Sequence, residues 1–326
     1  MFRAFPCLAI AIVAILESGF SATAQPVIRV GWGIPAEDSK YLLMQKPELF
    51  PNLGKTYRLE WFQFQSSALQ VQAMAANAVD CSAQGVLAMA QGLINGNVQS
   101  YVVAQHVYEK HGGFSVYWAV REDSSIRSVA DLRGRAVGIS AYGAGIYGPF
   151  AMYLRRNGLD PERDIRLVET GFPASEDAIR TGRVEAGVLN QPFAARAELK
   201  GGLRRLFAIS DEIPNMVHIL EVCRKDFTDA NEAAVRNYIQ DLTSAIDLVI
   251  SNREQSLAVA SKVTRVSPEV LGGYMLTDRD FGRTEGAAPD FLAIQKLLDL
   301  YSDTKMLARK IDVATFKHPT IVAPLR

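Results

Sequence analysis

The chain has 326 residues, enough for one or two domains with a large buried core. Its 35 basic and 35 acidic residues balance, which excludes the strong charge bias typical of proteins that bind nucleic acid or a charged membrane surface. A hydrophobic content of 48% is ordinary for a globular protein. We therefore expect no nucleic-acid partner.

The N-terminus predicts a secretory signal peptide over residues 1–24. Arg3 supplies a positive charge, and the apolar run at 7–16 is too short to span a bilayer comfortably. An Ala-Thr-Ala sequence at 22–24 matches a small-residue cleavage site. The mature chain is expected to begin near Gln25, outside the cytoplasm.

Strand-like and helix-like segments alternate after this point. The first set has expected strands at 27–32, 57–64, 79–83 and 98–106, with helices at 68–77 and 86–95. An extended run at 114–121 leads to a second set, with strands at 136–139, 165–169 and 185–189 and helices at 146–157 and 174–180. Further strands are expected within 203–223, and the chain from residue 229 onward is expected to be almost wholly helical. This alternation predicts an α/β fold with largely parallel sheets.

An internal similarity suggests two related lobes. Residues 73–80 read AMAANAVD, and residues 178–185, 105 positions later, read AIRTGRVE. Each copy is the end of a helix, a turn, a Val-acidic pair and then a strand that ends in a polar loop. Two similar lobes facing each other across a cleft would produce this pattern, and chance similarity of helix-turn-strand units is the alternative.

The extended segments at 114–121 and 206–223 bracket the middle third of the chain. If that third is a second lobe, these segments are the two crossovers between lobes, and the helical last third returns to complete the first lobe. Such a discontinuous domain forms a hinge. We predict lobe 1 over residues 25–117 and 213–326, and lobe 2 over residues 118–212.

Two cysteines, Cys81 and Cys223, remain after removal of the signal peptide. A disulfide between them is chemically possible in an oxidising compartment, but the sequence gives no distance between the two Cα atoms. Because both lie in apolar strand-like runs, the sequence favours two buried free thiols. The four histidines show no metal-ligand spacing, so no metal or cofactor is expected.

Several motifs together carry a resemblance to a known family. They are VADLRGRAVG at 129–138, the Gly-rich loop at 141–145, GRVEA at 182–186, NQPF at 190–193 and RKDF at 224–227. With this order and spacing, the chain resembles the periplasmic solute-binding proteins of ABC importers, in the aliphatic-sulfonate, taurine and nitrate group. That group also includes binders of thiamine-pyrimidine precursors.

The resemblance implies a type II periplasmic-binding-protein fold. In it, two lobes, each a mostly parallel sheet flanked by helices, are joined by a two-strand hinge. It also implies a monomeric periplasmic protein that captures a small organic anion, sulfonate-like or carboxylate, by lobe closure. The protein would then deliver its ligand to the ABC permease and ATPase subunits in the inner membrane.

The loops at the C-terminal ends of the strands are expected to line the cleft, because ligands bind there in open α/β sheets. Several of these loops open helices, whose unpaired N–H groups favour anions. Glu37 and Asp38 could bind an amine, although a solvated loop is the favoured interpretation. The candidate ligand-binding residues are Trp32, Gln65, Ser66, Ser67, Gln84, Ser140, Tyr142, Gly143, Ala144, Gly145, Asn190 and Gln191.

Three other functions stay open at this point. Trp32, Tyr142 and the hydroxyl-poor loop at 141–145 would suit an aromatic or heterocyclic ligand. A periplasmic sensor subunit would use the same lobe closure as an importer subunit. An enzyme is disfavoured, because the sequence has no nucleophile elbow, no P-loop and no cysteine cluster of the kind used by a pyrimidine synthase on the same fold.

Overall fold

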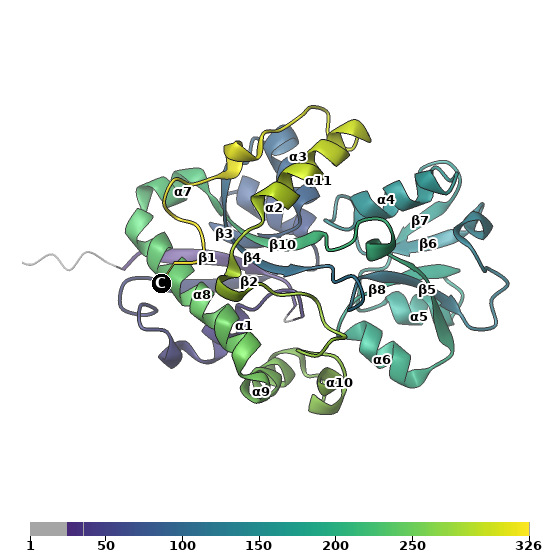
Figure 1. Cartoon of the computed structure of the whole chain (residues 1–326), viewed down its shortest axis with the longest axis horizontal. Coiled ribbons are helices and arrows are strands. Elements are labelled where there is room, and N and C mark those ends of the chain that lie inside the picture. The colour runs from purple at the N-terminus through teal and green to yellow at the C-terminus, as the bar shows by residue number, and fades with distance from the viewer. Residues whose placement is uncertain (1–24, 35, 326) are drawn as a thin grey trace, which may run out of the picture.

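The computed structural model describes residues 25–34 and 36–325, which form two five-stranded sheets flanked by helices (Figure 1). The predicted signal peptide lies outside the described residues. The first sheet has the order β2-β1-β3-β10-β4, with strands β1 (Val27–Trp32), β2 (Arg58–Gln63), β3 (Cys81–Gln84), β4 (Ser100–Tyr108) and β10 (Val217–Arg224). The second has the order β7-β6-β8-β5-β9, with strands β5 (Tyr117–Arg121), β6 (Ala136–Ile139), β7 (Arg166–Glu169), β8 (Ala186–Leu189) and β9 (Leu203–Ala208).

Helices cover both sheets. Those of the second lobe are α4 (Tyr147–Arg156), α5 (Ser175–Arg180) and α6 (Phe193–Lys200). The first lobe holds α1 (Tyr41–Gln45), α2 (Ser67–Ala75), α3 (Val86–Gly96), α7 (Lys225–Ala230), α8 (Glu232–Ser251), α9 (Arg253–Thr264), α10 (Pro268–Gly272) and α11 (Phe291–Asp303). The expectation of an almost wholly helical last third is wrong for residues 273–290 and 304–317, which hold only short 3-10 turns at Glu285–Ala287 and Val313–Phe316. Four glycines and a proline between residues 272 and 290 disfavour a continuous helix in the first of these stretches.

The two sheets have the same topology. In the first sheet β1 pairs in parallel with β2 and β3, and in the second sheet β6 pairs in parallel with β7 and β8. One antiparallel strand then follows in each sheet: β10 lies between β3 and β4, and β5 lies between β8 and β9. Each of these antiparallel strands arrives from the other lobe. The mostly parallel, two-lobed α/β fold is therefore confirmed.

The sequence similarity at an offset of 105 residues corresponds to equivalent structure. Asn77 and Gly182 both adopt a positive φ at the turn that follows the helix. In each lobe the residue immediately before a strand is acidic, Asp80 before β3 and Glu185 before β8. Asp80 accepts a hydrogen bond from the backbone N–H of Arg29 in β1 at 2.9 Å, and Glu185 accepts one from that of Ala136 in β6 at 2.8 Å. The acidic residue of the repeated Val-acidic pair thus joins β3 to β1 in the first lobe and β8 to β6 in the second.

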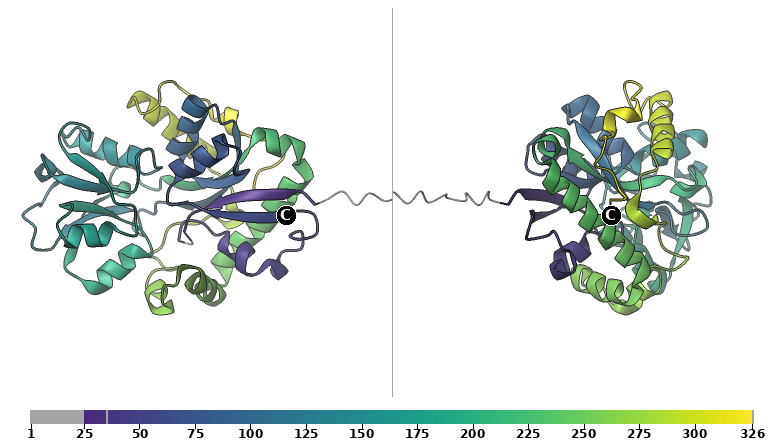
Figure 2. Two further views of the ribbon diagram at one scale, coloured as in Figure 1. Left: turned by 180° about the vertical axis from the view of Figure 1, so that it is seen from behind. Right: turned by 60° about the vertical axis from the view of Figure 1, so that its left-hand side comes forward.

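Two chain passes connect the lobes. The chain leaves the first sheet after Tyr108 and enters the second at Tyr117, then returns between Ala208 and Val217. The backbone N–H of Glu109 donates to the carbonyl of Met216 at 2.8 Å, which joins the two passes side by side. Figure 2 shows the teal second lobe at one end of the molecule and the purple, green and yellow elements of the first lobe at the other. The boundaries at 117/118 and 212/213 stay a prediction.

The sequence preference for two free thiols is wrong, because Cys81 and Cys223 form a disulfide. The two residues lie directly opposite each other on the antiparallel strands β3 and β10, with Cα atoms 4.0 Å apart. Both are fully buried, as the apolar runs predicted. The bond joins residues 142 positions apart and so closes a loop that contains the whole second lobe.

An aromatic stack holds the second lobe together around the end of β6. The Trp118 ring stacks between Phe150 of α4 and Phe207 of β9, at centroid distances of 4.5 and 5.1 Å. Its indole N–H donates to the carbonyl of Gly138 at 2.8 Å. Burial of such rings stabilises the lobe by roughly 2–3 kcal/mol each. The stack thereby fixes the loop that follows β6 relative to the start of α4.

Among the helices of the described residues, none combines the length and apolarity needed to cross a bilayer.

Candidate functional site

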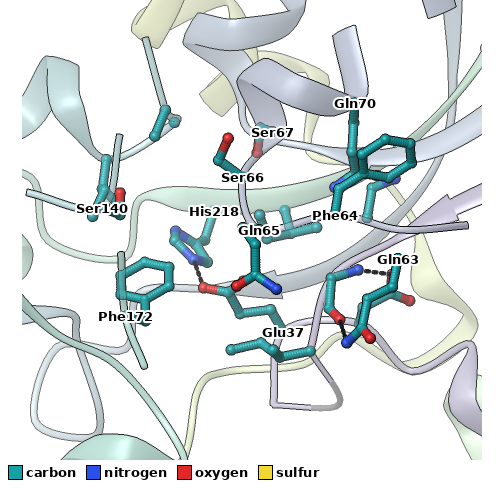
Figure 3. Close-up of a pocket in the computed structure, with 18 of the residues that line it drawn as sticks. Glu37, Gln63, Phe64, Gln65, Ser66, Ser67, Gln70, Ser140, Phe172 and His218 are labelled. Carbon is teal, nitrogen blue, oxygen red and sulfur yellow. Dashed lines mark hydrogen bonds and ion pairs between the residues drawn. The ribbon is translucent and has the colours of Figure 1, made fainter. Parts of the chain in front are cut away.

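A pocket lies between the two lobes (Figure 3). The first lobe contributes the loop after β1, the loop between β2 and α2, and the start of β10. The second lobe contributes the loops after β6 and β7 and the start of α6. The lining residues are Gly33, Ile34, Glu37, Asp38, Gln63, Phe64, Gln65, Ser66, Ser67, Gln70, Ala83, Ser140, Ala144, Gly145, Ile146, Phe172, Pro173, Phe193, His218 and Ile219.

Two serines at the start of α2 face the pocket from the first lobe. Ser66 caps the helix, its Oγ accepting from the N–H of Leu69 at 3.4 Å, and Ser67 Oγ accepts from the N–H of Gly85 at 3.2 Å. Each hydroxyl keeps its own proton for donation. The first N–H groups of a helix also lack intrahelical partners. This wall can therefore donate several hydrogen bonds to an oxyanion.

The second lobe places a hydroxyl on the opposite wall. Ser140 follows β6 directly, and its Oγ is buried with no hydrogen-bond partner among the described residues. Ala144 and Gly145 then lead into α4, so the N-terminal end of this helix also borders the pocket. An unpartnered buried hydroxyl carries a free-energy cost that a ligand oxygen would remove.

The two walls meet at a pair of glycines. A Cβ added to Gly85, before α3, would lie 2.6 Å from the Cα of Gly145, before α4. Any side chain at either position would collide with backbone of the other lobe. These two glycines therefore permit the backbones of the lobes to touch at the edge of the pocket.

The base of the pocket holds a buried imidazole between two carboxylates. His218 Nε2 lies 2.8 Å from Glu37 Oε1, and His218 Nδ1 lies 3.1 Å from Glu109 Oε1. Burial lowers the pKa of His218, but the two carboxylates outweigh it and raise that pKa above its usual value. Burial raises the pKa of Glu109, which His218 offsets only in part. Asn190 at the end of β8 donates to Glu37 Oε1, so this group also joins the two lobes.

A second buried ion group lies behind Asp38. Lys40 pairs with Asp38 at 3.1 Å and with Glu221, and His106 Nε2 lies 3.0 Å from Glu221 Oε2. Tyr238 donates to the other Glu221 oxygen at 2.8 Å. Burial disfavours the Lys40 cation, but its two carboxylate neighbours raise the pKa of Lys40 overall. This group anchors the loop after β1, so the expectation of a solvated loop at Glu37 and Asp38 is wrong.

The remaining walls are apolar. Phe64 follows β2, Phe172 follows β7 and Phe193 begins α6. Ile34, Ile146 and Ile219 add aliphatic surface. The pocket therefore combines a polar strip of serines with room for an apolar ligand body, as small-molecule sites commonly do.

The twelve residues predicted from the sequence divide into two sets. Those that line the pocket are Gln65, Ser66, Ser67, Ser140, Ala144 and Gly145. Those that do not are Trp32, Gln84, Tyr142, Gly143, Asn190 and Gln191. Trp32 is buried, and Tyr142 is half exposed at the surface. Gln84 donates to Ser82 Oγ at 2.8 Å inside the first lobe, and Gln191 accepts from the N–H of Ala195 at 3.1 Å.

His218 and the three phenylalanines of the pocket are not among the residues predicted from the sequence. His218 is the second residue of β10 and lies 181 positions from Glu37 along the chain, so no local pattern connects them. The one available signal for the phenylalanines was that Phe64 ends an expected strand at 57–64 and Phe172 lies three residues after an expected strand at 165–169. Among the described residues, no three His, Cys, Asp or Glu side chains are arranged to hold a metal ion.

Comparison with known proteins gives consistent relatives. Residues 49–268 match a protein family described as "ABC transporter, phosphonate, periplasmic substrate-binding protein". A putative aliphatic sulfonates-binding protein of Escherichia coli K12 is 23% identical over 257 residues, which are 78% of each chain.

Solved structures with the same fold include two further relatives. The alkanesulfonate-binding protein SsuA from Xanthomonas axonopodis pv. citri, bound to MOPS, is 20% identical, with a TM-score of 0.73 over 90% of this chain and 99% of that one. The periplasmic nitrate-binding protein NrtA from Synechocystis PCC 6803 is 11% identical, with a TM-score of 0.71 over 89% of this chain and 84% of that one. At these identities the likeness to solved structures shows the fold.

Proposed function

The chain belongs to the phosphonate-type family of periplasmic substrate-binding proteins of ABC transporters, and we propose that its ligand is a small organic anion captured by closure of the two lobes. The family is one of substrate-binding proteins rather than enzymes, with a small-molecule ligand and membrane permease and ATPase partners. The named binding of sulfonates by two relatives is in keeping with this class of ligand.

The observation that carries the proposal is the facing pair of hydroxyl walls. Ser66 and Ser67 approach the pocket from the first lobe and the unpartnered Ser140 from the second. An oxyanion between them would accept hydrogen bonds from both lobes at once. Such a ligand binds the closed form better than the open form, and that difference is what drives closure.

The pocket-lining serines and Gly145 are our proposed ligand contacts. We propose that two of the sequence candidates outside the pocket, Gln191 and Asn190, hold its walls in position. Gln191 accepts a hydrogen bond from the N–H of Ala195 near the start of α6, and Asn190 donates one to Glu37. We also propose that the mature protein is a periplasmic monomer released by signal-peptide cleavage, and that it has no nucleic-acid partner.

An aromatic or heterocyclic anion is the second candidate ligand. Trp32 and Tyr142 do not line the pocket, but Phe64, Phe172 and Phe193 do. Three aromatic walls could stack on a planar ligand. A sulfonate or carboxylate on an aromatic ring would use both features of the pocket.

The test is thermal unfolding of the mature protein against a panel of ligands. The panel holds alkane sulfonates, taurine, nitrate, aromatic carboxylates and sulfonates, and aminopyrimidines. A ligand at 100 times its Kd should add about 2.7 kcal/mol of stability and raise Tm by several degrees. Ser140→Ala should weaken the best ligand roughly 5- to 20-fold, since one hydrogen bond is lost.

Ser244→Ala, at an exposed position on α8, is the matched control and should leave affinity unchanged. A panel without any stabilising anion would contradict the proposal. Equal affinities of wild type and Ser140→Ala would remove Ser140 from the site.

A further inference from the structure

A second cavity, the hinge cavity, lies beside the chain passes that connect the lobes. The second lobe supplies its apolar walls, with Ala119 of β5, Leu189 of β8, Ala197 of α6 and Leu203 of β9. Phe114 lines it from the pass that leads into the second lobe. No residue lines both this cavity and the pocket between the serine walls. The hinge cavity can therefore hold the apolar body of a separate small molecule.

Three arginines line the hinge cavity, against one carboxylate. Arg205 pairs with Asp211 at 2.9 Å, and Arg279 pairs with Glu198 at 2.8 Å. Arg204 donates to backbone carbonyls, and within the described residues no carboxylate pairs with it and its buried Nε has no hydrogen-bond partner. The arginines therefore exceed the carboxylates that contact them by one. An oxyanion is the ligand group that would balance this charge.

Gln191 adds an amide donor from a buried position. The residue is 2% exposed, and it lines the hinge cavity but not the pocket between the serine walls. Its Oε1 accepts from the N–H of Ala195, while its Nε2 makes no hydrogen bond to any described residue. An unused donor on a buried side chain carries a free-energy cost that a ligand oxygen would remove. The hinge cavity thus combines apolar walls with a free donor and an excess positive charge.

Both lobes contribute to the hinge cavity. Arg279 belongs to the first lobe, and its ion pair joins that lobe to Glu198 on α6. Tyr117 donates to the other oxygen of Glu198 at 3.1 Å. Figure 1 shows α10 of the first lobe beside α6 of the second at this place. A ligand that contacts both sides would stabilise this arrangement of the lobes, in which the serine walls face each other.

A row of packed rings leads from the hinge cavity to the base of the pocket. The Phe114 ring lies edge-on to Phe281 at a centroid distance of 4.8 Å, and Phe281 stacks on His218 at 5.2 Å. Phe114 lines the hinge cavity and His218 lines the pocket. The same elements at the hinge therefore border both sites.

We propose that the hinge cavity is a second ligand site, which takes an organic anion with an apolar body and strengthens capture of the ligand in the pocket. Because both ligands favour the same arrangement of the lobes, each raises the affinity of the other by the same factor. The coupling rests on the proposed function, which supplies lobe closure. The site itself rests on the walls and charges of the hinge cavity.

Methyl NMR of protein labelled at leucine and isoleucine follows both sites at once. Leu189 and Leu203 report on the hinge cavity, and Ile34 and Ile146 report on the pocket. The probes are hexanoate and hexan-1-ol, which differ in the carboxylate. Hexanoate should shift the Leu189 and Leu203 signals and bind about 10- to 100-fold more tightly than hexan-1-ol, the range for hydrogen bonds to a charged group. Saturating hexanoate should tighten the Kd of the best panel compound, read at Ile34 and Ile146, about 5-fold or more.

Two variants separate the site from a general effect of charge. Arg205→Gln, whose partner Asp211 lies on the same side of the hinge, should weaken hexanoate binding about 10-fold. It should leave the Kd of the panel compound unchanged when hexanoate is absent. Arg163→Gln, at an exposed position of the same lobe, is the matched control and should leave both Kd values unchanged.

The second site is overturned by hexanoate shifts confined to Ile34 and Ile146, by equal binding of hexanoate and hexan-1-ol, or by unchanged hexanoate binding in a folded Arg205→Gln variant. An unchanged Kd for the panel compound with the hinge cavity occupied overturns the coupling. A panel without any stabilising anion overturns the proposed function, while the Leu189 and Leu203 signals still decide whether the second site exists.

Discussion

The disulfide between Cys81 and Cys223 should contribute a large share of the stability of this protein. The double substitution Cys81→Ala and Cys223→Ala removes a cross-link that closes a loop of 142 residues. In the chain-entropy treatment, opening a loop of that length gives the unfolded chain about 17 cal/mol/K, or about 5 kcal/mol at 25 °C. Measured losses for native disulfides fall at about 2–5 kcal/mol, so we expect a value in that range.

Thermal and urea unfolding provide the assay. For a chain of this size the unfolding entropy is about 0.6 kcal/mol/K, so Tm should fall by about 3–8 °C. Reduction of the wild type should produce a similar shift, while ligand affinity stays unchanged because neither cysteine lines the pocket. Two titratable thiols in the unfolded, unreduced wild type would show that the bond is absent, and equal Tm values for wild type and the double variant would show that it does not stabilise the protein.

Three further predictions concern the lobe contact, the buried imidazole and the strand clamp. Gly85→Ala places a Cβ 2.6 Å from the Cα of Gly145, so it should hold the lobes apart and weaken ligand binding at least about 10-fold; an unchanged Kd by calorimetry would contradict this. The folded state raises the pKa of His218 above 6.5, so the imidazolium stabilises the fold below that pH and this contribution is lost as the pH rises through the folded pKa. Wild type should therefore lose Tm relative to His218→Gln as the pH rises above 6.5, and parallel profiles would count against the pairing. Asp80→Asn removes a buried carboxylate that binds the Arg29 backbone and guanidinium, and should cost about 2–3 kcal/mol in urea unfolding. The exposed Glu60→Gln should cost less than about 0.5 kcal/mol, and equal costs for the two variants would argue against the clamp.

The architecture could be predicted from the sequence because it depends on local patterns. The strand at 27–32 was predicted with the bounds that β1 has, and the repeat at an offset of 105 residues marked equivalent positions in two lobes. The hydroxyls of Ser66, Ser67 and Ser140 could be placed at the pocket because each follows the end of a strand. Position along a strand or loop is information that a sequence carries.

The direction of side chains and the pairing of distant residues could not be predicted. Trp32 ends β1 as expected, but its ring is buried in the protein, and Tyr142 points to solvent. The register that sets Cys81 opposite Cys223 follows from how β10 returns from the second lobe. Glu37 was expected in a solvated loop because its partner His218 is 181 residues away.

Capture of an organic anion between the two lobes is tested most directly by a crystal structure with the panel compound that gives the largest thermal shift. We expect a closed molecule in which the oxyanion lies about 2.7–3.2 Å from Ser140 Oγ and from a hydroxyl or N–H group at Ser66 or Ser67. An oxyanion that contacts only one lobe would contradict it. So would a ligand found only in the separate cavity lined by Arg204, Arg205 and Arg279.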